Sequence, residues 1–185
     1  MTKTELKKLI AEEMQVYSIT KKNIGEKRFR HQKRYMIWKA VKRLRIYEYR
    51  CAKRDGSNNA LSEHWRAFWV KFAERRLNKA SEKVDIELTA NMIGKNVRIC
   101  HDNVVINGRI GEGCIFHGNN VVGNKRTGAS NEIPRLGNHV DVGFGAMIIG
   151  DVEIANDCII GAGAVVTKSF TKPGSVIVGV PARGI

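Results

Sequence analysis

The architecture of this chain follows from the run Ile148-Ile149-Gly150-Asp151-Val152-Glu153-Ile154-Ala155-Asn156-Asp157-Cys158-Ile159-Ile160-Gly161-Ala162-Gly163-Ala164-Val165-Val166. An aliphatic residue recurs at every sixth position of this run, and the same spacing extends over the second half of the chain, with register shifts between 105 and 110 and between 122 and 136. The apolar positions of the repeat are Ile93, Ile99, Val105, Ile110, Phe116, Val122, Leu136, Val142, Ile148, Ile154, Ile160 and Val166. A fixed short period of this kind indicates a stack of structural repeats.

Each six-residue unit predicts a short strand followed by a corner. One aliphatic side chain points inward, a small residue takes a second crowded site, and Gly, Asn and Asp supply tight or left-handed corners. Three units close one triangular coil, and stacked coils pair their strands in parallel about 4.8 Å apart. We therefore predict a mainly β fold for residues 84–185, a parallel β-helix of about four coils with a C-terminal tail.

Residues 1–83 predict a basic α-helical region. Thr2 and Glu5 have capping-box spacing ahead of an apolar repeat, which predicts a first helix. Residues 28–51 place apolar side chains among Arg and Lys at helical spacing, which predicts a basic amphipathic helix.

A break is predicted at residues 55–59, where Gly, Ser and Asn cluster. Ser62 is then the candidate cap of a last helix that runs to about Lys79. This helix carries aromatic residues at mixed three- and four-residue spacing, and we interpret them as core or subunit contacts rather than a ligand site. They are Trp65, Phe68, Trp69 and Phe72.

The net charge of +14 comes entirely from residues 1–84, which hold 23 of the 32 Lys and Arg and 9 of the 18 Asp and Glu. Such a segment is attracted to nucleic acid or to anionic lipid. We expect no nucleic-acid partner, because the segment contains no recognition module. Peripheral contact with an anionic membrane and a merely solvated charged surface both remain open.

Neither a signal peptide nor an apolar run of membrane-spanning length is evident, so we expect a cytoplasmic protein, at the inner face of the membrane if the basic helices bind lipid. The four cysteines have no paired spacing, which favours inert thiols in a reducing compartment. No histidine pair has the spacing of a metal site, so no metal is expected.

The repeat resembles the hexapeptide-repeat acyltransferases, whose fold is a left-handed parallel β-helix. The run from Ile148 to Val166, followed by Gly179-Val180-Pro181-Ala182, is typical of their C-terminal signature. Within that group the chain is similar to the serine acetyltransferase branch, which includes many enzymes of surface-polysaccharide pathways. The segments that carry this similarity are Val84-Asp85-Ile86, Cys100-His101-Asp102-Asn103-Val104-Val105-Ile106, Val122-Gly123-Asn124 and Pro134-Arg135-Leu136-Gly137.

The resemblance implies that His101 is a general base and that Asp85 orients it, although the spacing between them is one residue longer than usual. A hydroxyl acceptor is a weak nucleophile, so attack on an acetyl thioester requires a base such as imidazole. Grouping the repeats in threes places His101 beside Gly118, where the missing side chain leaves room for a substrate. The same register places His117 on Cys100, where it lines the same cleft or is only structural.

An eight-residue insertion near residues 125–132 interrupts the repeat, and insertions in a solenoid form binding loops. In serine-specific members this loop carries a second histidine just before the proline, and here that position is Ile133. An aliphatic side chain cannot make the same polar contact. Asn131 and Glu132 are the candidate replacements.

The resemblance also implies acetyl-CoA as co-substrate and a homotrimer with its active site between neighbouring subunits. Room for the pantetheine arm is expected along the late coils, where a ligand could approach the backbone and bond its amide groups. These positions are Gly145, Ala146, Gly163 and Ala164, and the candidates for the nucleotide phosphates are Lys168 and Arg183.

We consider two acceptor classes for an acetyl-CoA-dependent O-acetyltransferase of this kind. Serine fits the general similarity, and it would place the protein in cysteine biosynthesis. A sugar hydroxyl of a polysaccharide precursor fits the aliphatic Ile133 and the basic N-terminal region, and we favour it. The third hypothesis is a scaffold without enzymatic activity that binds membrane or nucleic acid.

Overall fold

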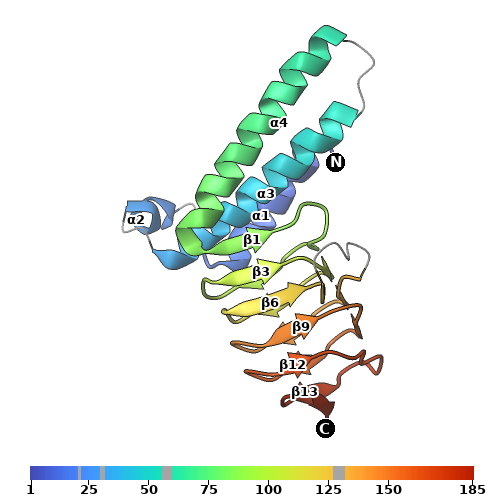
Figure 1. The fold of residues 1–185 in the computed structure, drawn as a ribbon. Helices are drawn as coiled ribbons and strands as arrows, with labels where there is room; N and C mark the ends of the chain where they lie inside the picture. Colours follow the sequence, from blue (N-terminus) through green and yellow to red (C-terminus); the bar gives the residue numbers. More distant parts are fainter. Residues whose placement is uncertain (21, 30–31, 56–59, 127–131) are drawn as a thin grey trace. The chain divides into compact units, whose positions relative to one another are not determined.

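A computed structural model describes residues 1–20, 22–29, 32–55, 60–126 and 132–185 of the chain (Figure 1). It divides into two compact units, Met1–Val84 and Asp85–Ile185. This boundary lies one residue from the predicted one. Among the described residues, no helix combines the length and the apolar composition needed to cross a bilayer.

The first unit is helical, as predicted. Its elements are α1 (Lys3–Val16), α2 (Ile24–Phe29), α3 (Lys33–Asp55), α4 (Ala60–Ser81) and the short 3-10 helix η1 (Glu82–Val84). The predicted capping box is confirmed, since the Thr2 hydroxyl accepts a hydrogen bond from the Glu5 N–H and the Glu5 carboxylate accepts one from the Thr2 N–H. Ser62 lies inside α4 and not at its start, so the predicted cap is wrong.

The helical unit has its apolar core between α3 and α4, which lie side by side (Figure 1). One face of each helix is buried: Ile37, Trp38, Val41 and Leu44 on α3, and Val70, Ala73, Leu77 and Ala80 on α4. The aromatic residues of α4 lie outside this core, so of the two predicted roles, core or subunit contact, the core role is wrong and the subunit role stays a prediction. The residues 56–59 of the predicted break lie outside the described part of the chain.

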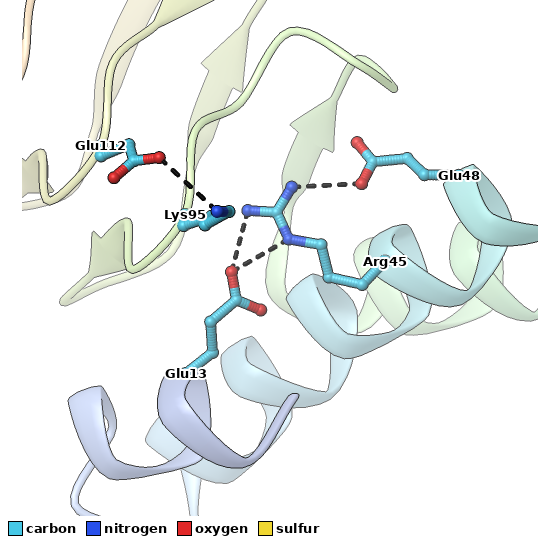
Figure 2. A network of polar contacts seen from close by, with 5 residues as sticks. All are labelled: Glu13, Arg45, Glu48, Lys95 and Glu112. Carbon is cyan, nitrogen blue, oxygen red and sulfur yellow. Dashed lines mark hydrogen bonds and ion pairs between the residues drawn. The ribbon is translucent and has the colours of Figure 1, made fainter. Parts of the chain in front are cut away.

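A buried ion network joins α1 to α3 (Figure 2). Arg45 donates hydrogen bonds from Nε and Nη2 to Glu13 Oε1, at 2.9 Å and 2.8 Å, and Arg45 Nη1 lies 3.1 Å from Glu48 Oε2. Burial alone would lower the pKa of Arg45, but the two carboxylates raise it above its ordinary value. The arginine therefore stays charged, and it compensates a carboxylate that water cannot reach.

The second unit is a parallel β-helix. Its strands are β1 (Ile86–Leu88), β2 (Arg98–Ile99), β3 (Val104–Ile106), β4 (Arg109–Ile110), β5 (Ile115–Phe116), β6 (Asn120–Gly123), β7 (Arg135–Leu136), β8 (Asp141–Val142), β9 (Met147–Ile149), β10 (Glu153–Ile154), β11 (Ile159–Ile160), β12 (Val165–Val166), β13 (Val176–Val178) and β14 (Arg183–Gly184).

These strands form the three faces of the prism. Sheet A has the order β1-β3-β6-β9-β12, sheet B the order β4-β7-β10, and sheet C the order β2-β5-β8-β11-β13-β14. All pairings are parallel except that of β13 with β14, which ends the stack. Figure 1 shows the strands of sheet A one above another. Five strands in sheet A mean that the stack has about one coil more than the predicted four.

The inward ladders confirm the repeat at eleven of the twelve predicted positions and correct it at one. Val105 points outward, whereas Ile106 is buried and pairs with Val122. The reason is an extra residue in the corner between β2 and β3. The step from Ile99 to Ile106 is seven positions, whereas the equivalent steps in the following coils, from Phe116 to Val122 and from Val142 to Ile148, are six.

The corners use left-handed backbone, as the polar and glycine positions predicted. One corner stacks Asn96, Gly113, His139, Asp157 and Gly174, and another stacks Asp85, Asn103, Asn119, Gly145 and Gly163, all with positive φ. Asparagine, aspartate and glycine tolerate this conformation best. Ion pairs across neighbouring coils, such as Lys95 with Glu112 at 4.0 Å (Figure 2), lie at the surface and contribute little.

Candidate active site

His101 lies in the corner between β2 and β3 that contains the extra residue. The strand register pairs Ile99 with Phe116, and Asn119 N–H bonds to the Asp102 carbonyl, so Asp102 is the residue with no equivalent in the next coil. The side chain of His101 is exposed. The longer corner thus presents an imidazole at the surface of an otherwise regular prism.

Gly118 lies directly beside His101 in the next coil, as predicted, but the prediction that it leaves room for a substrate is wrong, because His101 itself fills that space. A methyl group built on Gly118 would lie 2.5 Å from His101 Cβ, and φ at this glycine is +120°. Both the close approach and the backbone conformation require glycine here. Phe144, from the coil after that, places its ring edge-on to the imidazole with 6.4 Å between ring centres.

A buried amide holds this corner in place. Asn120 is fully buried, and its Oδ1 accepts a hydrogen bond of 2.9 Å from the Gly118 N–H. Its Nδ2 donates to the carbonyls of Gly143 and Ala146, at 2.8 Å and 3.2 Å. Asn120 thus fixes the backbone beneath His101. The sequence offered a signal for this role, because Asn120 is the polar member of a ladder otherwise filled by Val104, Ala146 and Ala164.

Asp85 lies one coil before His101, where it stacks on Asn103. Its carbonyl accepts a hydrogen bond of 3.1 Å from the Val104 N–H, which ties the two coils together. Within the described ranges, no hydrogen bond or ion pair joins the Asp85 carboxylate to His101. The orienting role of Asp85 stays a prediction.

The structure pairs His117 with a carboxylate that sequence reasoning missed. His117 Nε2 lies 2.8 Å from Asp141 Oδ1, and both side chains are partly exposed on the outer surface of sheet C. His117 stacks on Cys100, as predicted. The repeat already contained the signal for this pair, because His117 follows the inward Phe116 and Asp141 precedes the inward Val142 of the neighbouring coil. His139 and Asp157 form a similar but longer pair, at 3.3 Å.

The inserted loop is described only in part. Asn131 lies outside the described residues, and Glu132 lies 4.0 Å from Arg126, both partly exposed. Ile133 is buried, with 6% of its surface exposed. The position at which the resemblance expects a histidine is therefore turned into the core.

Of the four positions expected to receive the pantetheine arm, the glycines leave room at the surface and the alanines are buried. Gly163 has open space where a side chain would be, whereas the methyl groups of Ala146 and Ala164 are buried. The N–H groups of Gly145, Ala146, Gly163 and Ala164 donate to carbonyls inside the prism. A ligand approaching here would find room, but these N–H groups are occupied.

The predicted phosphate ligands gather at the end of the stack. Lys168 lies over the ring of Phe170, 5.6 Å from its centre. Gly184 approaches the same ring, and Arg183 is its exposed neighbour in β14. Lys168 therefore lies on the aromatic ring that Gly184 approaches, and Arg183 is the residue before Gly184.

The six-residue repeat and the stacked parallel strands define a fold class, the left-handed hexapeptide-repeat β-helix. Residues 134–168 match the family described as "Bacterial transferase hexapeptide (six repeats)". The Mycobacterium tuberculosis serine acetyltransferase is 35% identical over 132 residues, which cover 66% of this chain and 56% of that protein. The serine acetyltransferase of Buchnera aphidicola subsp. Schizaphis graminum is 33% identical over 107 residues, 54% of this chain and 39% of that protein.

Solved serine acetyltransferases share the fold. The Brucella abortus strain S19 structure covers 99% of this chain and 70% of its own with a TM-score of 0.66 at 18% identity. Soybean serine acetyltransferase complexed with serine covers 82% of this chain and 58% of its own, with a TM-score of 0.60 at 22% identity. The second unit therefore has the fold of the solved serine acetyltransferases, and residues 134–168 match the hexapeptide-repeat family. The chain spans 56% and 39% of the two curated relatives it matches.

Proposed function

We propose that this protein is an acetyl-CoA-dependent O-acetyltransferase in which His101 is the general base. The observation that carries the proposal is the exposed His101 imidazole on its enlarged corner, which packs closely on Gly118 of the next coil. The similarity to serine acetyltransferases supports the same reaction class. A corner with only a structural role would not need the extra residue, Asp102, that follows His101.

In this mechanism, His101 accepts the proton of the acceptor hydroxyl while its oxygen attacks the thioester carbonyl. The carbon–sulfur bond then breaks, the thiolate leaves, and the imidazolium returns the proton to it. The products are an acetyl ester and free CoA. General-base catalysis of this kind contributes about 10² to 10⁴ in rate. We propose Asp85 as the group that orients the imidazole and Lys168 and Arg183 as the cations that meet the CoA phosphates.

L-Serine is the acceptor that the named relatives favour. A second candidate is a sugar hydroxyl, and the buried Ile133 is the observation that favours it. The polar contact expected there in serine-specific members is missing. His117 and Glu132 are the polar groups that could bind an acceptor of either class.

We propose a homotrimer, which would place His101 at a crevice between subunits. Sheet A supports this assembly, because its strands align Val105, Val121, Met147 and Val165 in one outward-facing apolar ladder. Such a ladder resembles the core of an interface rather than a solvated surface. A single-copy mass in solution would contradict this assembly.

The experiment is release of CoA thiol from acetyl-CoA with L-serine, nucleotide sugars and oligosaccharides as acceptors. We expect His101→Ala to lower kcat at least about a hundredfold with unchanged thermal unfolding, because the side chain is exposed. His139→Asn is the matched control, since His139 is an exposed corner histidine and asparagine tolerates its left-handed backbone. Equal activity of wild type and His101→Ala on every accepted substrate would contradict the mechanism.

A further inference from the structure

Helix α4 has a second apolar face that is not part of the helical core. Its exposed aromatic side chains are Trp65, Phe68, Trp69 and Phe72, with 66%, 54%, 40% and 41% of their surfaces exposed. They follow three- and four-residue steps and touch one another ring to ring. We call this set the aromatic stripe. Contiguous exposed apolar surface of this kind marks an interaction site.

Cations lie directly on the aromatic stripe. The Arg50 guanidinium lies 5.1 Å from the centre of the Trp69 ring, and that of Arg76 lies 5.3 Å from the centre of the Phe72 ring. Arg76 continues the face of the stripe one turn beyond Phe72. The same helix face therefore changes from aromatic to basic along its length.

A hollow of about 410 Å³ adjoins this basic end, between α3, α4 and η1. It is lined by Lys39, Arg43, Phe72, Arg76, Lys79, Ala80 and Lys83. None of these seven lining residues is acidic, and five of them are cationic. Phe72 and Arg76 belong both to this basic hollow and to the helix face that carries the stripe.

Positive charges crowd one another in and next to the basic hollow. Burial, and then the charge of Arg76, lower the pKa of Arg43. Burial, and then the charge of Arg43, lower that of Lys42 on the same helix. Like charges held this close disfavour one another. A bound anion would relieve that repulsion.

We infer that this face of α4 docks on an anionic phospholipid surface, with the aromatic stripe at headgroup level and lipid phosphates in the basic hollow. Aromatic side chains beside Lys and Arg on one helix are the composition of interfacial membrane binding. Charge argues against a second copy as the occupant, because each copy brings +14 from the same unit. This inference stands on the helical unit alone and does not rest on the proposed acetyltransferase activity.

The test is flotation of the full chain with vesicles at low salt. We expect binding to phosphatidylcholine mixed with phosphatidylglycerol and none to phosphatidylcholine alone. Arg76→Gln with Lys79→Gln should weaken binding roughly thirtyfold, because each cation near such a surface contributes about 1 kcal/mol. Phe68→Ser with Trp69→Ser should weaken it at least about tenfold. The substituted side chains are at the surface of α4, and circular dichroism checks that each variant stays folded.

The control pair Lys3→Gln with Lys7→Gln removes the same charge from α1, and we expect it to bind nearly as well as wild type. An equal loss in this control pair would show that only net charge matters and would overturn the docking face. Tighter binding to a single-stranded oligonucleotide, lost in the same α4 variants, would also overturn it. So would a smaller oligomer, measured by light scattering, for Phe68→Ser with Trp69→Ser.

Discussion

The His117 imidazole and the Asp141 carboxylate are in contact across two neighbouring coils, with 2.8 Å between Nε2 and Oδ1. Because the Asp141 carboxylate holds Nε2 of His117, the orientation of the imidazole is fixed and its Nδ1 points in a defined direction. A surface pair contributes little to stability. Its value for the proposed reaction is orientation, because His117 stacks on Cys100, the residue before His101.

Asp141→Asn tests whether this pair holds His117 for the acceptor. We expect the KM for the acceptor to rise about tenfold with a smaller change in kcat, since a hydrogen bond to a charged group contributes about 1.5–3 kcal/mol. The measurement is steady-state kinetics with the acceptor varied at saturating acetyl-CoA. Asp157→Asn breaks the comparable pair with His139 and should leave KM unchanged. Equal KM values for the Asp141→Asn variant and wild type would contradict this role.

Gly118→Ala tests the packing beneath His101. The added methyl group would lie 2.5 Å from His101 Cβ, on a backbone with φ of +120°. We expect the free energy of unfolding to fall by about 1–3 kcal/mol and kcat to fall with it, since the histidine must shift. Urea unfolding and thiol release measure the two effects. Gly123→Ala is the control, because nothing lies within 4 Å of its added methyl group. A stable, fully active Gly118→Ala variant would show that the corner relaxes without moving His101.

Arg45→Met tests the buried network of the helical unit. The variant leaves Glu13 buried without its cation, so we expect a loss of about 3–5 kcal/mol in the free energy of unfolding. The double variant Glu13→Leu with Arg45→Met removes both charges of this contact, and it should regain most of the loss. Helical circular dichroism during urea titration follows both. If the double variant is as unstable as the single one, the loss reflects packing rather than an uncompensated charge.

The repeat predicted the fold because one inward side chain at every sixth position reflects the geometry of the coil itself. It misplaced Val105, because a period cannot tell which corner holds an added residue, and here that corner carries His101. The period also could not place Asp85 relative to His101, because the two residues lie in neighbouring coils and their separation depends on the lengths of the corners between them. The helical unit was predicted from spacing, but Trp65 and its neighbours were not placed. Helix α4 has two apolar faces, and the sequence does not state which one packs on α3.

We expect the protein to lose stability at alkaline pH, because the buried Cys114 thiol must stay neutral in the folded state. Burial raises its pKa from 9.0 to about 11, although backbone N–H groups near the sulfur lower it in part. Its Sγ donates a hydrogen bond of 3.2 Å to the Gly137 carbonyl. The thiol is therefore held in its neutral form inside the prism.

The folded state keeps the Cys114 thiol proton at pH values at which the unfolded chain has lost it, so stability falls as the pH rises. Below pH 9.0 both states hold the proton and the contribution of Cys114 is complete, whereas between 9.0 and about 11 only the folded state holds it. Over that range the free energy of unfolding falls by about 1.4 kcal/mol per pH unit. The Cys114→Ala variant has no thiol at this position. Urea unfolding at pH 9.0 and at about pH 11 should therefore show a larger fall in the free energy of unfolding for wild type than for the variant. Parallel declines would mean that the Cys114 thiol ionises as easily in the prism as in the unfolded chain.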